Sequence, residues 1–444
     1  MGRKFNYQLP ITNYQLPIQG IKSKIALATS SPWLFVPTLN FAQGVPYVII
    51  NSVSVVFYKQ LGVDNAQIAF WTSFLYLPWV LKMFWGALVD SYYTKRNWVI
   101  YTQFALSCCL LCLAFSLQLP NFFFVSILAL AIGGFISATH DIAADGFYLL
   151  ALNSKEQAFF VGIRSVFYRL ATIFASGIVV FWAGQLESKL GIALGWTAAI
   201  ALCALIFTSI FLFHCFVPTP TTDVEKHTTT AEIKTLYSQV IKSYFSQPKI
   251  WAILAFILLY RFGEAMLVKL TAPFLLDEIQ LGGLGLSTAD VGLIYGTVGT
   301  FALVVGGILG GILIAKYGIK RTIWFMALAL NLPNLFYVYL AYVQPSINLV
   351  YLLVGIEQFG YGLGTAAYSI YLIYLCQTEY KTSHFAISTG IMALGMMLPG
   401  LISGYLQQLL GYPMFFMLVC ILTIPGMLTL FFIPIKDKES ISQI

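Results

Sequence analysis

The sequence predicts an all-α polytopic membrane protein, in which twelve transmembrane helices form two pseudo-symmetric six-helix bundles. The first reason is composition. Of the 444 residues, 59% are hydrophobic and only 9% are charged, whereas an ordinary soluble domain has about 25% charged residues. The second reason is a series of long apolar runs, and the third is a repeat between the two halves of the chain. A transmembrane β-barrel is not expected, because the apolar stretches are continuous rather than alternating.

The apolar runs set the order of the elements. About twelve of them reach the length that spans a bilayer. Their approximate bounds are 33–58, 67–89, 98–118, 122–151, 157–183, 192–216, 250–274, 288–315, 321–343, 347–376, 383–409 and 413–434. In the first run, Gly44 and Pro46 are expected to weaken the helix locally.

A polar segment rich in proline, threonine and charged residues separates six runs from the next six. Its second part, 230–245, has apolar residues at helical spacing, which predicts an amphipathic helix on the membrane surface. We therefore expect a disordered tail at 1–32, an N-terminal bundle at 33–216, a cytoplasmic linker at 217–249, a C-terminal bundle at 250–434 and a second tail at 435–444.

The positive charge is distributed as topology requires. The net charge is +7, and the basic residues lie mostly in loops on one side of the expected spans, with only Lys59 and Lys189 in loops on the other. This positive-inside pattern predicts that both termini are cytoplasmic, so nucleic-acid binding is not expected. The seven cysteines lack metal-ligand spacing, and neither a metal site nor a cofactor is expected.

The two halves resemble copies of one unit. The stretch GALVDSYYTKR at 86–96 aligns with GILIAKYGIKR at 311–321, and each joins the second and third spans of its half. A duplicated six-span unit with a binding site between the copies is transporter architecture. The loop residues that we expect to act in gating are Gly86, Asp90, Lys95, Arg96, Lys320 and Arg321.

These stretches resemble a known family. The 86–96 loop is similar to the loop motif of the major facilitator superfamily, although the second copy has Ala315 in place of the acid. A closer resemblance is to the bacterial muropeptide permease (AmpG) family, and more distantly to acetyl-CoA transporters. FAQGVP at 41–46, LKMFWGALVD at 81–90 and, above all, SATHDIAADGF at 137–147 carry it. The resemblance implies proton-driven uptake of muropeptides or related amino-sugar compounds.

The sequence departs from the permease pattern in two places. His140 stands where the permeases have glutamine, and Gly146 to Leu150 replace a tryptophan and charged residues. If this segment contacts the solute, the protein carries a different one.

The same signature supplies the candidate charge network. Asp141 and Asp145 share one helix face, and at 1.5 Å per residue they match Arg169 and Arg164 in depth. Ionisable groups inside a membrane are functional by default, so we expect proton coupling or gating; a static ion pair between helices is the alternative. His140 is either a titrating member of this network or a polar helix contact.

Other polar residues within spans complete the candidates. Glu264 lies three residues after Arg261, close enough to pair locally. Glu357 stands alone in the tenth span, where it binds a proton or a substrate amine or, alternatively, makes an internal hydrogen bond to a tyrosine or serine. Both glutamates are assigned to the proton-coupling or charge-network set. Candidate solute-binding residues are Asn40, Gln43, Asn51, Arg261 and Tyr361.

The sequence therefore predicts a secondary active transporter that imports muropeptide-like compounds, coupled to protons, as a monomer in the bacterial inner membrane. Its expected partners are a small-molecule solute, protons and the lipid bilayer. An ATP-driven pump is not expected, because no phosphate-binding loop motif is present. The alternatives are a transporter of another organic solute (an oligosaccharide, a peptide or an acyl-CoA type), a membrane enzyme that uses His140 and Asp141, or a receptor.

Overall fold

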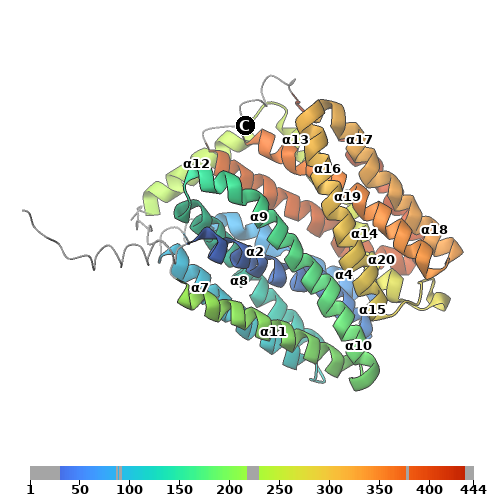
Figure 1. Ribbon diagram of the computed structural model, residues 1–444. Coiled ribbons are helices and arrows are strands. Elements are labelled where there is room, and N and C mark those ends of the chain that lie inside the picture. The colour runs from blue at the N-terminus through green and yellow to red at the C-terminus, as the bar shows by residue number, and fades with distance from the viewer. Residues whose placement is uncertain (1–30, 87–88, 90–92, 218–229, 377–379, 436–444) are drawn as a thin grey trace, which may run out of the picture.

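The computed structural model describes residues 31–86, 89, 93–217, 230–376 and 380–435. Several predictions concern residues outside these ranges. They are most of the expected tails at 1–32 and 435–444, the first part of the linker, and Asp90. Figure 1 shows two groups of helices, one formed by the N-terminal half and one by the C-terminal half.

The described residues of the N-terminal half form six helical stretches, several of them interrupted. Their bounds are α2 (Pro32–Val48), η1 (Ile49–Val53) and α3 (Ser54–Gln60); α4 (Asn65–Phe74), α5 (Leu77–Leu81) and η2 (Lys82–Phe84); α7 (Lys95–Ser116); α8 (Phe122–Ala151); α9 (Ser154–Thr172), η3 (Ile173–Val179) and α10 (Val180–Leu190); and α11 (Ile192–Phe216).

The C-terminal half follows the linker helix α12 (Thr230–Phe245). Its elements are α13 (Ile250–Leu259) and α14 (Phe262–Leu276); η4 (Ile279–Leu281); α15 (Thr288–Val291), η5 (Gly292–Gly299) and α16 (Thr300–Tyr317); α17 (Ile319–Asn331), η6 (Leu332–Asn334) and α18 (Leu335–Val343); α19 (Ile347–Leu375); and α20 (Lys381–Thr429).

The predicted fold class, a polytopic helical membrane protein, is confirmed. Within the described residues, nine helical stretches are long and apolar enough to cross a membrane. The expected span at 67–89 is broken into short helices around Pro78. The last two expected spans form one assigned helix, α20, whose backbone turns at Gly411, with φ 70°. The number twelve therefore stays a prediction.

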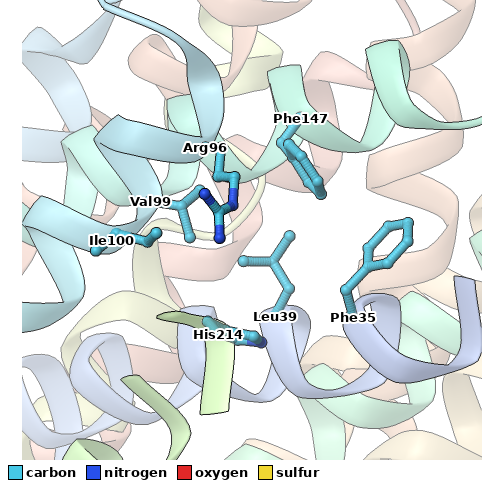
Figure 2. Close-up of a pocket in the computed structure, with 7 residues that line it drawn as sticks. All are labelled: Phe35, Leu39, Arg96, Val99, Ile100, Phe147 and His214. Carbon is cyan, nitrogen blue, oxygen red and sulfur yellow. The ribbon is translucent and has the colours of Figure 1, made fainter. Parts of the chain in front are cut away.

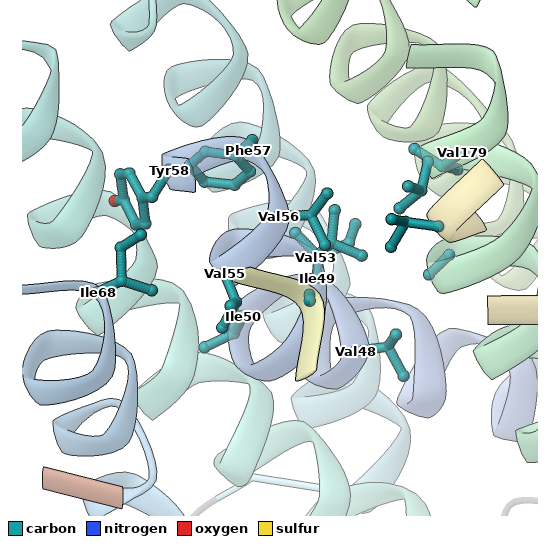
Figure 3. Packing of buried hydrophobic residues seen from close by; sticks show 14 of the residues in the cluster. Val48, Ile49, Ile50, Val53, Val55, Val56, Phe57, Tyr58, Ile68 and Val179 are labelled. Atoms are coloured by element: carbon teal, nitrogen blue, oxygen red, sulfur yellow. The ribbon is translucent and has the colours of Figure 1, made fainter. Parts of the chain in front are cut away.

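The apolar cores show how the halves meet. We call the end that holds 61–64, 277–287 and 411 the outer end, and the end that holds α12 the inner end. One large core at the outer end combines residues of both halves, and Figure 3 shows its packing around the first span. At the inner end each half has a separate core. The largest apolar core that the halves share thus lies at the outer end, and α5 and η2 of the N-terminal half also contact α20 of the C-terminal half.

Small residues allow the closest approach between the halves. The backbones of η3 and η5 touch, and a Cβ on Gly292 would lie 2.7 Å from the backbone nitrogen of Phe181. Helices α10 and α15 meet beside this contact (Figure 1). Glycine at such a crossing lets two helices pack backbone against backbone. Gly44 has the same role within the N-terminal half, because a Cβ there would lie 3.1 Å from the carbonyl oxygen of Tyr168.

Candidate functional site

The N-terminal half holds an ion pair inside its fourth and fifth spans. The Arg164 guanidinium donates to the Asp145 carboxylate, as the depth of the two residues predicted. Arg164 Nε also donates to Asn40 Oδ1 at 3.1 Å, and Gln43 Nε2 donates to Asp145 at 3.4 Å. The Asp145 side chain is nevertheless 51% exposed.

Asp141 does not pair with Arg169 as its depth predicted. Its Oδ2 accepts a hydrogen bond of 2.9 Å from the indole of Trp79. Among the described residues, the only ion pair that involves an arginine is Arg164–Asp145. Depth along a helix fixes height but not rotation, so the prediction for Asp141 failed where the one for Asp145 succeeded.

His140 faces away from the two aspartates. It is fully buried, and its Nε2 lies 3.2 Å from Gln103 Nε2. The chain continues from Gln103 Oε1 to His214 Nδ1 at 3.0 Å and from His214 Nε2 to Thr38 at 2.8 Å. Neutral histidines can make all three of these contacts, while His140 Nδ1 is buried without a hydrogen-bond partner among the described residues. Adjacent helical residues point about 100° apart, so His140 and Asp141 do not form one site.

The loop motif caps helix ends beside this chain. Arg96 Nη2 donates to the carbonyl of Cys215 at 3.2 Å, and Lys95 Nζ donates to that of Val89 at 2.9 Å. Cations at the C-terminal ends of helices satisfy unpaired carbonyls. Figure 2 shows Arg96 and His214 beside a small, mainly apolar pocket at the inner end. Lys320 and Arg321, in the second copy, are exposed.

The candidate polar residues of the first span are buried and hydrogen-bond to other groups of the protein. Asn40 is buried and donates to the carbonyl of Val36 at 2.8 Å as well as accepting from Arg164. Asn51 is also buried; its amide nitrogen donates to the carbonyl of Tyr47 at 3.0 Å, and its Oδ1 has no hydrogen-bond partner among the described residues. The prediction that Asn40, Gln43 and Asn51 face a solute is not supported by this geometry; Asn40 and Gln43 instead position the Asp145–Arg164 pair.

The C-terminal half buries two carboxylates side by side. Glu264 and Glu357 are both fully buried and interact electrostatically. Glu357 accepts hydrogen bonds of 3.1 Å from Tyr337 and from Gln358. Neither oxygen of Glu264 receives a hydrogen bond from the described residues.

Arg261 does not form the local pair with Glu264 that their spacing predicted. It lies at the break between α13 and α14, with φ −112° and ψ 18°, so the two side chains do not share a helix face. Its guanidinium instead donates to the hydroxyl of Tyr361, over whose ring it lies at 5.0 Å.

Between the halves lies a group of aromatic and basic side chains, which we call the central cluster: Tyr47, Tyr76, Tyr168, Arg169, Arg261 and Tyr361. The Tyr47 ring centroid is 6.4 Å from that of Tyr76 and 6.4 Å from that of Tyr168. Tyr47 interacts electrostatically with both Arg261 and Arg169. Sequence reasoning did not select Tyr47, Tyr76 and Tyr168, because the many tyrosines of this chain give no sign of which ones face the interface.

Sequence reasoning also missed a polar lock at the outer end, formed by Lys59, Asn65, Asp277, Gln407 and Tyr412. Lys59 Nζ lies 2.5 Å from Asp277 Oδ1 across the two halves. Tyr412 donates to Asp277 at 2.6 Å, and Asn65 donates to Gln407 at 2.8 Å and to Tyr412 at 2.9 Å. The available signal was that Lys59 and Asp277 end the first spans of two repeated units.

Comparison with known proteins agrees with this architecture. The model of the Major Facilitator Superfamily matches residues 38–373 and 259–443. The chain belongs to the major facilitator superfamily. Superfamily members of solved structure have the same fold: a D-xylose-proton symporter (TM-score 0.68, 12% identity, covering 93% of this chain and 98% of that one) and the nucleoside transporter NupG (TM-score 0.66, 14% identity, covering 90% and 98%).

Within the superfamily, the chain is similar to permeases of the AmpG type. The anhydromuropeptide permease of Escherichia coli K12 is 25% identical over 400 residues, which cover 88% of this chain and 77% of the permease. The putative transporter AmpG 4 of Rickettsia felis is 26% identical over 408 residues, which cover 89% and 94%. The predicted resemblance to AmpG permeases is confirmed, and this superfamily member is a membrane-spanning transporter.

Proposed function

We propose that this transporter imports a muropeptide-like amino-sugar compound across a bacterial inner membrane and is driven by protons. The fourth-span signature and the similarity to an anhydromuropeptide permease support the choice of solute. Aromatic rings of the central cluster suit this solute, because flat apolar ring faces pack against sugars while phenol hydroxyls hydrogen-bond to them.

The departures from the permease pattern do not lie in the central cluster. His140 points to Gln103 in the core of the N-terminal half. Gly146 packs against the side chain of Lys95, 2.9 Å from where its Cβ would be, and Phe147 and Tyr148 are buried. These residues therefore give little reason to prefer a different solute. Another organic solute, such as an oligosaccharide or a peptide, remains the alternative.

One observation carries the proposal of proton coupling: Glu264 and Glu357 are buried together, and no cation of the described residues is in contact with them. Two ionised carboxylates in a low-dielectric interior repel each other and lose their hydration. The pair is therefore expected to hold at least one proton in this conformation. The groups that surround it are Arg261, Tyr295, Tyr337 and Gln358.

The Asp145–Arg164 pair is a weaker candidate for coupling. Both residues belong to the N-terminal half, so a rigid rocking of the two halves moves them together. Arg164 also compensates the Asp145 carboxylate by direct contact, so this carboxylate needs no proton to remain inside the span. We assign Asp145 and Arg164 to a fixed pair that stabilises α8 against α9. Asp141 and the C-terminal glutamates remain as candidate proton carriers.

We further propose that the outer end faces the periplasm and that the described conformation is closed on that side. Exposed Gln280 and Ser246 lie at the outer and inner ends. In a variant with the seven native cysteines replaced by serine, Gln280→Cys should react with an impermeant thiol reagent in spheroplasts and Ser246→Cys should not. The opposite pattern would reverse the assigned topology.

The transport function is tested with purified protein in proteoliposomes that are alkaline inside. We expect accumulation of a radiolabelled anhydro-muropeptide above its external concentration, and loss of the accumulation when a protonophore collapses the pH gradient. If the muropeptide is excluded while a plain oligosaccharide or peptide accumulates, the alternative solute class is correct. If any of them equilibrates but never accumulates, proton coupling is wrong.

A further inference from the structure

Each half contributes one arginine to the central cluster. Arg169 comes from α9 and Arg261 from the break between α13 and α14. The two guanidiniums interact electrostatically with each other, and both interact with Tyr47. Two cations from opposite halves therefore lie within electrostatic range of each other and of Tyr47.

Among the described residues, no acid contacts either arginine. The side chain of Arg169 makes no hydrogen bond or ion pair in the part of the chain that the structure describes. Arg261 donates to the neutral phenol of Tyr361, and its Nε is buried without a partner. By contrast, Arg164, which also lies inside a span, contacts the Asp145 carboxylate, the amide oxygen of Asn40 and the ring face of a tyrosine.

Like charges that face each other away from bulk water are unfavourable unless an anion lies between them. A guanidinium presents a planar fork of donors that fits a carboxylate in a bidentate manner. The orphaned Nε of Arg261 is one such donor. The surrounding phenols of Tyr47, Tyr76 and Tyr168 add further donors and aromatic faces.

We infer that Arg169 and Arg261 form a carboxylate clamp that binds the transported solute between the halves. This inference rests on the proposed transport function and specifies its substrate class: organic solutes with a carboxylate, in preference to neutral analogues of the same shape. Because the clamp draws one arginine from each half, a bound carboxylate attracts the halves toward each other at mid-membrane.

The clamp also links solute binding to the buried acid pair. Arg261 is the cation that interacts electrostatically with Glu264. A solute carboxylate that engages Arg261 competes with Glu264 for the same positive charge, which favours the protonated form of the Glu264–Glu357 pair. Bound solute and bound proton then stabilise each other, as reciprocal linkage requires.

The test compares acids with their neutral analogues in proteoliposomes. Two matched probe pairs are used: N-acetylmuramic acid with its methyl ester, and a dipeptide with its C-terminal amide. Each is offered as a competitor of the uptake of whichever labelled solute the wild type carries. The expected result is that the acid of at least one pair competes ~10- to 100-fold better than its neutral analogue, the range of one charged hydrogen-bonded contact.

Variants assign that preference to the two arginines. Arg169→Gln and Arg261→Gln should reduce the preference for the acid to less than about threefold, and Arg169→Lys should retain part of it, because the charge remains while the fork is lost. Lys189→Gln, which removes an exposed positive charge at the end of α10, is the matched control and should keep the full preference. Gel-filtration profiles and thermal unfolding midpoints identify variants that fold.

The possible outcomes distinguish a failure of the carboxylate clamp from a failure of the proposed transport function. Equal competition by acid and neutral analogue in the wild type overturns the clamp and leaves the transport function standing. An acid preference that persists in both folded glutamine variants also overturns it. If neither Arg→Gln variant folds, the preference in Arg169→Lys decides, and an undiminished value contradicts the clamp. Absence of uptake of any labelled solute refutes the transport function itself.

Discussion

The acidic residues Asp145, in the N-terminal half, and Glu264 and Glu357, in the C-terminal half, differ in burial and in charge compensation. In the N-terminal half, Asp145 is half-exposed and is paired with Arg164. In the C-terminal half, Glu264 and Glu357 are fully buried together, and the nearby Arg261 contacts a tyrosine instead. The sequence has a repeat that relates the halves, yet the charge balance inside them is not repeated.

The difference separates a structural role from a transport role. A pair whose negative charge is compensated by a cation in direct contact contributes to packing, and its charge stays balanced whether or not solute is bound. Uncompensated carboxylates beside the interface respond to any change in the nearest cation, and therefore to solute and to conformation. The predictions below test this division, beginning with the largest effect.

The largest effect is expected from neutralising the C-terminal acids. Glu357→Gln, or Glu264→Gln, should remove accumulation driven by a pH gradient, because no proton is then exchanged, while counterflow of labelled against unlabelled solute persists. For one proton per solute, a gradient of one pH unit supports about tenfold accumulation, which should fall to equality.

Asp145→Asn is the matched control in the N-terminal half. It should retain accumulation, although uptake is slower if α8 shifts against α9. If Asp145→Asn abolishes accumulation and both glutamine variants keep it, the division between the halves is reversed.

The next effect concerns the outer lock. Lys59→Met leaves Asp277 without its cation, although Asn65 and Tyr412 still donate to it. Loss of one partner of a mostly buried pair costs about 1–3 kcal/mol, which should raise the outward-open population ~5- to 150-fold. The measurement is the labelling rate of a cysteine at Ser73, a buried position beside Gly400 of the other half. An unchanged rate would show that the apolar core alone holds the outer end closed.

A smaller effect is expected on stability from the N-terminal ion pair. Arg164→Gln should lower the free energy of unfolding by about 1 kcal/mol, because the Asp145 side chain is half-exposed and water partly replaces the lost partner. Asp145→Asn in the same chain should restore most of this loss, as measured by a double-mutant cycle in detergent. A cycle that shows no coupling would mean that the ion pair contributes nothing to folding.

The smallest effect is expected at His140. His140→Gln can still accept the amide proton of Gln103, so the unfolding free energy should change by less than about 1 kcal/mol. Accumulation should keep its dependence on pH between 5.5 and 8. If the pH dependence of accumulation shifts in His140→Gln, His140 takes part in proton coupling.

The sequence was sufficient for the fold class and for part of the site. Composition and long apolar runs predicted a helical membrane protein, and depth arithmetic found the Asp145–Arg164 pair. The same arithmetic failed for Asp141, because it contains no information on rotation about the helix axis. Helical periodicity does contain that information, and it would have separated His140 from Asp141.

Other features required three-dimensional contacts. The outer lock joins Lys59 to Asp277 across the interface, and no local pattern links two residues so far apart. The break at Arg261 turned a plausible local pair into a contact with Tyr361. The loop motif was expected to act in gating. Instead, Arg96 donates to a backbone carbonyl at the end of α11, and Lys95 donates to one at the end of the second span.

The most direct test of the account is the proton movement that accompanies the solute. Proteoliposomes with an internal pH-sensitive dye, no initial pH gradient and the membrane potential clamped at zero receive the carried solute outside. The account predicts acidification of the interior by the wild type, the same acidification by Asp145→Asn, and none by Glu357→Gln, although Glu357→Gln still exchanges the labelled solute. Solute entry into wild-type vesicles without any change in internal pH would contradict proton coupling by the buried acid pair.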